Sequence, residues 1–214
     1  MNGIITRKFT MKEKTIRALF SRDHATVHPN LGVFLGGISP PDGDMKTGWR
    51  RKIISVLQND KRLDPSMIIV SPEPKSGYWE DIDGFDDSAS EKSLEISRKK
   101  QMHWELQYLK LCNITTFWLP AYWTKEKSGV FAPNIGPSSR WEFGYFFQEY
   151  LKDKQNRNFI VGSPEDAQGV EWAREITRVH GIKWHTLRKQ DKSKLVAESF
   201  IEEIADTLIK NKPE

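Results

Sequence analysis

Two glutamates, Glu105 and Glu142, are the residues of this sequence whose surroundings suggest covalent chemistry. Glu142 belongs to the run Ser138-Ser139-Arg140-Trp141-Glu142-Phe143-Gly144, which we expect at the start of a helix. There the helix dipole favours an ionised carboxylate, as a nucleophile or an electrostatic stabiliser requires. The spacing Ser139-x-x-Glu142 also fits a capping box, in which the glutamate only satisfies an amide at the helix end. Both interpretations stay open on spacing alone.

Glu105 lies in Gln101-Met102-His103-Trp104-Glu105, near the end of a long helix expected over 90–112. A crossover helix runs antiparallel to the strands, so Glu105 is expected at the flank of a site beyond the strand ends; a surface salt bridge is the alternative. Gly36-Gly37 ends an apolar run, where a ligand can approach the backbone, although a tight turn explains the pair equally well.

The sequence lacks the motifs of several other classes of site. The sequence contains neither GxGxxG nor GxxxxGK[ST], and Asp81-x-Asp83-Gly84-x-Asp86-Asp87 misses the calcium-loop pattern. His24 and His28 flank Pro29 in an irregular segment, and Cys112 is the single cysteine. We therefore predict no metal and no cofactor.

The apolar pattern predicts how these residues are positioned. Five short apolar runs, typical of buried strands, alternate with five helical patterns. The strands are expected at 31–38, 67–70, 113–119, 159–162 and 182–187. The helices are expected at 47–59, 90–112, 138–152, from Ser163-Pro164 onward, and at 191–210. Residues 1–30 are expected to form an N-terminal extension with a short helix near 13–20.

This alternation predicts one α/β domain over 31–214, a doubly wound sandwich with a five-stranded, mainly parallel sheet in the flavodoxin-like order 2-1-3-4-5. Ligands of such sheets bind beyond the carboxyl ends of the strands, here between loops 36–46 and 120–141. Four aromatic residues near this crevice are candidates to stack a base: Trp118, Tyr122, Trp123 and Trp141. The segment 72–91, with seven acids and one base, is expected to be an exposed loop beside it.

Composition narrows the class of protein further. No run approaches the ~18 apolar residues of a membrane span, and the N-terminus lacks the apolar core of a signal peptide, so we expect a soluble, cytoplasmic protein. The net charge is +4 with a basic remainder outside 72–91. No helix-turn-helix or aromatic-basic motif accompanies that charge, so a lysine-rich surface is favoured over nucleic-acid binding.

Three segments resemble the nucleoside 2-deoxyribosyltransferase family and its nucleotide N-hydrolase relatives. Val33-Phe34-Leu35-Gly36-Gly37 is similar to the opening strand of the family. A second stretch, from Trp104-Glu105-Leu106 through Phe117-Trp118-Leu119-Pro120, is similar to the part of the family that holds its acidic residue and its third strand. Arg140-Trp141-Glu142-Phe143-Gly144-Tyr145 resembles the segment that holds the catalytic glutamate, with Phe143 in place of the usual Leu. The similarity covers roughly residues 31–162.

The resemblance implies a site and a reaction. Glu142 would attack the anomeric carbon of a 2′-deoxyribonucleoside, and Glu105 would assist departure of the base. The Asp or Ser that the family often carries six residues before its nucleophile is Gly136 here, with Ser138 or Ser139 as substitutes. Base exchange through the glutamate is the expected activity. Hydrolysis of 2′-deoxynucleoside 5′-monophosphates, and a non-catalytic nucleotide-sensing module, are the alternatives. Relatives assemble into oligomers, so a homo-oligomer is expected.

Overall fold

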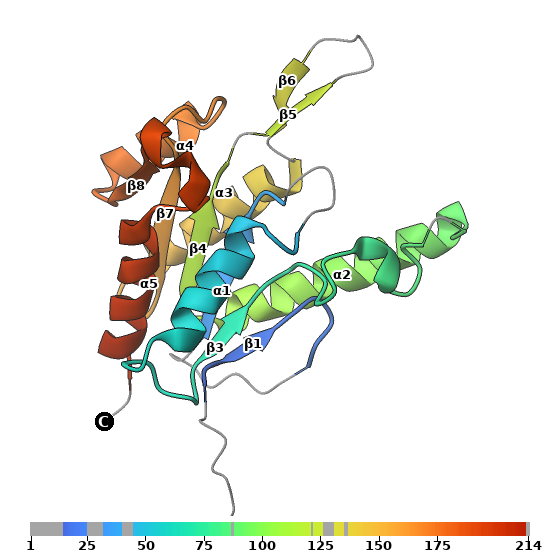
Figure 1. Ribbon diagram of the computed structural model, residues 1–214, viewed down its shortest axis with the longest axis horizontal. Coiled ribbons are helices and arrows are strands. Elements are labelled where there is room, and N and C mark those ends of the chain that lie inside the picture. The colour runs from blue at the N-terminus through green and yellow to red at the C-terminus, as the bar shows by residue number, and fades with distance from the viewer. Residues whose placement is uncertain are drawn as a thin grey trace, which may run out of the picture.

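A computed structural model describes residues 15–24, 32–39, 45–86, 88–120, 122–125, 131–134 and 137–212 (Figure 1). Its centre is one all-parallel sheet of six strands in the order β1-β3-β2-β4-β7-β8. The strands are β1 (Arg17–Leu19), β2 (Gly32–Gly37), β3 (Ile68–Val70), β4 (Ile114–Trp118), β7 (Asn158–Pro164) and β8 (Trp184–Leu187). A separate antiparallel hairpin, β5 (Tyr122–Lys125) and β6 (Phe131–Asn134), projects beyond the end of β4.

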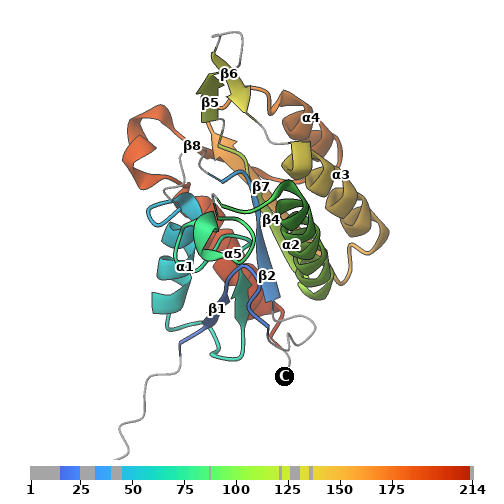
Figure 2. The same cartoon turned by 90° about the vertical axis from the view of Figure 1, so that its right-hand side faces the viewer.

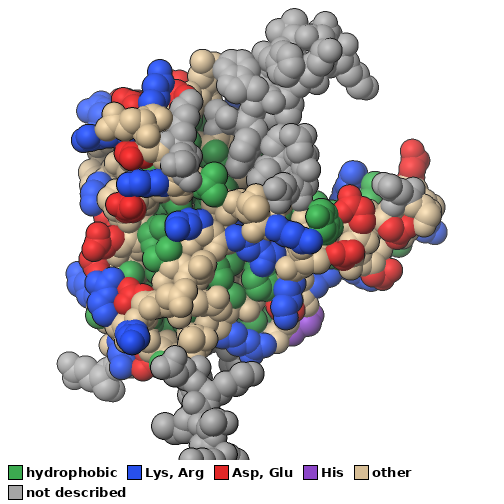
Figure 3. Space-filling view, in the orientation of Figure 1, with side chains coloured by type: hydrophobic (Ala, Val, Ile, Leu, Met, Phe, Trp, Pro, Cys, Tyr) green, Lys and Arg blue, Asp and Glu red, His purple; other side chains and the backbone are tan. Residues whose placement is uncertain are grey.

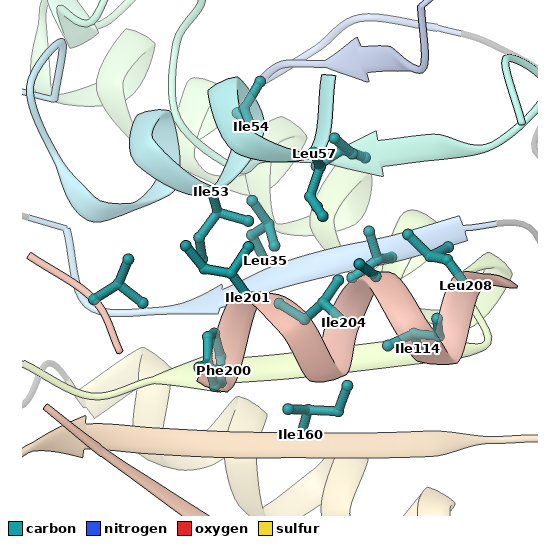
Figure 4. Packing of buried hydrophobic residues seen from close by; sticks show 14 of the residues in the cluster. Leu35, Ile53, Ile54, Leu57, Ile114, Ile160, Phe200, Ile201, Ile204 and Leu208 are labelled. Carbon is teal, nitrogen blue, oxygen red and sulfur yellow. The ribbon is translucent and has the colours of Figure 1, made fainter. Parts of the chain in front are cut away.

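Helices cover both faces of the sheet and make three layers (Figure 2). The helices are α1 (Trp49–Asn59), α2 (Glu91–Leu111), α3 (Pro137–Lys152), α4 (Glu171–Val179) and α5 (Glu198–Lys210), with 3-10 turns at Trp79–Asp81 and Lys189–Lys194. α1 and α5 pack on one face, where the side chains Leu35, Ile114 and Ile160 of the sheet meet Ile53 and Ile204 (Figure 4). α2, α3 and α4 pack on the other face. None of the helices described is long and apolar enough to cross a membrane.

The alternation of side chains along β4 explains the two cores. Ile114 and Trp118 point to the face under α1 and α5, and Phe117 points to the opposite face, against Phe143 of α3 and Phe159 of β7. Successive residues of a strand face opposite sides. A parallel strand buried on both faces therefore reads as a continuous apolar run, and this is why such runs marked β2, β3, β4 and β7 in the sequence.

The structure confirms an α/β sandwich around a parallel sheet but corrects the count and order of its strands. Residues 17–19 form an edge strand paired with β3, where the sequence predicted part of a short helix. Three residues carry too little periodicity to separate strand from helix. The sheet consequently has six strands instead of five, although the five expected strands keep their relative order within it.

Two helix starts also differ from expectation. Ser163 and Pro164 belong to β7, and the next helix begins only at Glu171. Ser163-Pro164-Glu165-Asp166 carries the residue types of a helix start. Pro164 is instead the last residue of β7, beyond Gly162, where the pairing of β7 with β4 ends, and a proline is tolerated at such a position. The final helix begins at Glu198 after a 3-10 turn, seven residues later than predicted. By contrast, α2 follows the prediction closely, with Ser90 as its N-cap.

Candidate active site

A cavity of about 500 Å³ opens at the carboxyl edge of the sheet, between α2, the start of α3 and the segment that follows β3. Its walls combine aromatic and apolar side chains with one cation and two carboxyl groups. The residues that line it are Trp79, Phe85, Arg98, Gln101, Met102, Glu105, Leu106, Trp141 and Glu142. The segment 72–91 thus contributes Trp79 and Phe85 to the cavity, and its acidic side chains gather at the projecting end of the molecule beside α2 (Figure 3). The segment lies beside a cavity, as expected, but it is not exposed throughout, because Glu73 is 1% exposed.

The length of α2 explains how its N-terminal half reaches the site. The 21 residues of α2 extend about 30 Å, whereas the five residues of β4 extend only about 16 Å. Because the helix ends near the start of β4, its N-terminal half overhangs the carboxyl edge of the sheet and forms one wall of the cavity. Glu105 lies six residues, about 9 Å, before the end of α2, so it does not belong to the overhanging half. It nevertheless lines the cavity and does not lie only at its flank.

Glu105 and Glu142 contact each other through a hydrogen bond between their side chains. Both carboxyl groups are half-buried, and neither can keep a full hydration shell. One of the two carboxyl groups must be protonated to donate this hydrogen bond, and the other accepts it as a carboxylate. Two carboxyl groups this close cannot both ionise without strong repulsion, and the pair holds one proton between them.

The proton on Glu142 corrects an expectation from the sequence. Burial, followed by the charge of Glu105, raises the pKa of Glu142 to about 8. Burial also raises the pKa of Glu105, partly offset by hydrogen bonds from Gln101 and Glu142. We expected the N-terminus of the helix to keep Glu142 ionised, but α3 begins at Pro137 and has no acid in its first turn. The dipole fades within the first turn, so desolvation dominates.

The same helix start excludes the capping box. A capping box needs Ser139 as the residue just before the helix. Ser139 instead lies inside α3, is buried, and donates a hydrogen bond from Oγ to the carbonyl oxygen of Gly37 at 3.4 Å. It therefore ties α3 to the end of β2. Glu142 directs its carboxyl group to Glu105 and is free of any role as an end cap.

A chain of hydrogen bonds holds Glu105 from the side opposite Glu142. The Gln101 amide donates to Glu105 Oε1 at 2.8 Å and to the Pro72 carbonyl at 3.2 Å. The Gln101 carbonyl oxygen accepts from Ser21 Oγ at 2.5 Å. Since both ends of the amide are occupied, its orientation is fixed, and an N–H group always faces Glu105. The segment after β1 and the segment after β3 thus position a carboxyl group of α2.

Arg50 of α1 supplies a buried positive charge next to the two glutamates. Its guanidinium donates to the carbonyl of Leu35 at 2.8 Å, to the carbonyl of Gly37 and to Ser39 Oγ, and it forms an ion pair with Glu73. Arg50 and Glu73 are both 1% exposed. The charge of Arg50 lowers the pKa of each glutamate and opposes the effect of burial. Arg50 thereby favours the singly ionised pair over a fully protonated one.

The other candidate residues from the sequence have different positions. Trp141 is 54% exposed, lines the cavity and stacks on Tyr145. Trp118 does not line the cavity: it is fully buried on the other face of the sheet, against Phe200 of α5, because its place in β4 turns it away from α2 and α3. Its assignment to a base-stacking site was wrong. The side chains of Tyr122, Trp123 and Ser138, and residue Gly136, lie outside the described residues.

Gly36 and Gly37 serve the approach of β2 to β4. A Cβ on Gly36 would lie 2.7 Å from the Thr116 carbonyl oxygen, and one on Gly37 only 2.1 Å from that of Trp118. Gly37 also has a φ of +129°, a conformation that other residues rarely adopt. Neither glycine lines the described cavity. The structure thus gives both glycines a packing role, at the strand end that Arg50 and Ser139 also contact. Their contact with a ligand stays a prediction.

Sequence reasoning missed Arg50, Glu73 and Gln101. One signal for Arg50 was present, because it shares a helix face with Ile53, Ile54 and Leu57, and a cation in an apolar stripe requires a buried partner. No local pattern marks Glu73 or Gln101, whose partners lie far away in the chain. Among the described residues, no group of three or more His, Cys, Asp or Glu side chains is arranged to hold a metal ion.

Models of known protein families give no match to this chain. A search of curated proteins likewise finds no significant relative.

Proposed function

We propose that this protein cleaves the N-glycosidic bond of 2′-deoxyribonucleosides and transfers the sugar to a second base, with Glu142 as the nucleophile and Glu105 as the proton donor. The observation that carries the proposal is a pair of hydrogen-bonded carboxyl groups, sharing one proton, in the wall of an aromatic cavity at the carboxyl edge of a parallel sheet. Glycoside cleavage uses two carboxyl groups in different protonation states. The resemblance of the two glutamate segments to the deoxyribosyltransferase family agrees with this assignment.

The shared proton makes the two roles compatible. Burial raises the pKa of Glu142 to about 8, and Glu142 cannot attack while it holds the proton. Transfer of the proton across the hydrogen bond to Glu105 leaves Glu142 as a carboxylate. Its oxygen then bonds to the anomeric carbon while the bond from that carbon to the base breaks. The electron pair goes to the base, which takes the proton from Glu105, so the products are a free base and a deoxyribosyl ester of Glu142.

The second half of the reaction reverses these steps with another acceptor. A second base loses its ring N–H proton to Glu105 and attacks the anomeric carbon, and the ester bond returns its electron pair to Glu142. Water in place of the base gives free deoxyribose. The dyad ends with the single proton with which it began. Arg50 keeps the dyad anionic overall, a charge that stabilises the oxocarbenium character of the sugar during both halves.

The test is base release and base exchange with a panel of deoxynucleosides, with and without a free acceptor base. Exchange identifies a transferase and free deoxyribose a hydrolase; the same panel as 5′-monophosphates covers the nucleotide alternative. Glu142→Gln and Glu105→Gln should each lower the rate at least about 100-fold, because neither amide can attack or deliver the proton. Glu149→Gln, on the same helix but outside the cavity, is the matched control.

Intact-protein mass spectrometry examines the covalent step directly. A deoxyribosyl adduct on Glu142 should accumulate with the parent protein when no acceptor base is added, and should be absent from Glu142→Gln. Saturable nucleoside binding without turnover would indicate the sensing module instead. Activity of Glu142→Gln within about threefold of the parent would remove Glu142 from the mechanism.

A further inference from the structure

Arg98 is the one cation in the wall of the described cavity, and the proposed reaction does not use it. It is exposed, and among the described residues its guanidinium has no hydrogen bond or ion pair. Arg22, by comparison, has partners for both of its terminal nitrogens: it donates to the carbonyls of Asp83 and Ser97, and it lies over the ring of Phe85. Arg22 fixes the segment that covers the cavity, whereas Arg98 keeps all its donors for a ligand.

Helix geometry places Arg98 along the direction in which the base must lie. Arg98, Gln101 or Met102, and Glu105 succeed each other at intervals of three or four residues, so they share one face of α2. Seven residues of helix put the backbone of Arg98 about 10 Å from that of Glu105. With Glu142 at the sugar and Glu105 at the bond to the base, the base extends from Glu105 along α2 toward Arg98.

The walls along this direction suit a flat heterocycle. Trp79 and Phe85, in contact at 5.3 Å between ring centroids, line the same cavity as Met102 of α2, and Trp141 adds a further ring from α3. Aromatic faces stack any base and give little discrimination among bases. The end of the base away from the sugar meets Arg98. The polar groups on that edge of the base therefore decide which base the cavity binds.

The charge around Arg98 favours a neutral acceptor edge over a phosphate. The covering segment carries Glu80, Asp81, Asp83 and Asp86 close to Trp79 and Phe85, and these carboxylates repel an anion. A phosphate site normally combines several cations or backbone N–H groups, and only one cation lines this cavity. A guanidinium fork, however, matches two adjacent acceptors on a base, as in its bidentate contact with O6 and N7 of guanine.

We infer that Arg98 selects 6-oxopurine bases, guanine and hypoxanthine, by donating two hydrogen bonds to O6 and N7. Adenine offers a donor in place of O6, so its amino group faces the guanidinium without a partner. Pyrimidines lack the second ring and fall short of Arg98. This inference rests on the proposed function, since Glu105 and Glu142 define where the sugar and the base lie.

The experiment compares cleavage of deoxyguanosine, deoxyinosine, deoxyadenosine, deoxycytidine and thymidine by the parent and by Arg98→Met, which retains the aliphatic stem without the donors. The parent should prefer the two 6-oxopurines over deoxyadenosine by at least about tenfold in kcat/KM. Arg98→Met should lose most of that preference and keep its rate with deoxyadenosine within about threefold. Lys100→Met, an exposed cation of α2 outside the cavity, should behave as the parent.

The outcomes separate the inference from the proposed function. Cleavage of all five nucleosides at similar rates, or a preference that Arg98→Met leaves intact, would overturn the selection by Arg98 and leave the glycosidic chemistry standing. No cleavage of any nucleoside or nucleotide would overturn the proposed function and the inference with it. The panel also includes deoxyguanosine 5′-monophosphate. A preference for it over deoxyguanosine that disappears in Arg98→Met would assign Arg98 to phosphate and refute base selection.

Discussion

Replacing Glu142 by glutamine should stabilise the protein at alkaline pH, although it removes the proposed nucleophile. In the unfolded chain Glu142 has an ordinary carboxyl pKa of 4.5, and in the folded protein that pKa is about 8. Below pH 4.5 both states hold the proton, and the shift has no effect on stability. Between these values the unfolded state releases its proton and the folded state retains it, so rising pH favours unfolding. Above pH 8 both states have lost the proton, and the full cost of burying the ionised carboxylate lowers the stability of the folded protein.

The magnitude follows from the size of the shift. At 1.36 kcal/mol per pKa unit, the difference between 4.5 and about 8 corresponds to about 5 kcal/mol. Glu142 is half-buried and retains part of its hydration, so we expect the net cost to be about 2 kcal/mol. Glutamine cannot ionise, and its amide can still donate to Glu105. Glu142→Gln should therefore raise Tm at pH 8.5 by roughly 4–8 °C, with much less change at pH 5.

Thermal unfolding of the two proteins at pH 5 and pH 8.5 measures this difference. Glu149→Gln is a control of opposite sign, because the hydrogen bond from Lys152 lowers the pKa of Glu149, and losing that carboxylate removes a small stabilisation at pH 8.5. A parent and a Glu142→Gln protein with equal Tm at pH 8.5, or a difference that is the same at both pH values, would refute the shared proton.

Three further predictions concern the surroundings of the dyad. Arg50→Met leaves Glu73 buried without its ion pair and should lower the free energy of unfolding in urea by about 3–5 kcal/mol, whereas a loss below 1 kcal/mol would contradict the buried pairing. Gly37→Ala should be strongly destabilising in the same assay, because Gly37 has a positive φ and the added Cβ would meet the Trp118 carbonyl. Gly144→Ala, with open space around it in α3, should stabilise the protein by about 0.5–1 kcal/mol. The reverse ranking would contradict the close packing of β2 on β4. Finally, kcat/KM for nucleoside cleavage should fall above pH 8 as Glu142 loses the shared proton, and a rate that still rises at pH 9 would be inconsistent with that requirement.

Local patterns in the sequence predicted the central part of the fold well. The apolar runs of β2, β4 and β7 and the long helix α2 are strong signals, because a parallel strand is apolar on both faces and a long helix has room for both caps. β1 was missed since its three residues belong to the sheet only through pairing with β3, a long-range contact. Local propensity contains no information on such a contact.

The candidate site, like the fold, was predicted from local patterns only in part. Glu105 and Glu142 were found from their segments, and the structure brings their carboxyl groups together. Their protonation was not predictable, because the pKa of Glu142 depends on burial and on a neighbour 37 positions away in the sequence. The face to which Trp118 points was equally hidden, since it depends on the register of β4 against helices on both sides.

The contacts of Arg50 have a consequence for protein engineering. Its guanidinium links the end of β2, the helix α1 and the segment after β3, and Ser139 attaches α3 to the same strand end. A designer who moved only the two glutamates to another scaffold would obtain a repelling acid pair without its counter-charge. Because Ser21 and Arg22 hold Gln101 and the covering segment, the smallest transferable unit runs from β1 to the start of α3, more than half of the chain. Within it the covering segment could be exchanged to accept other bases.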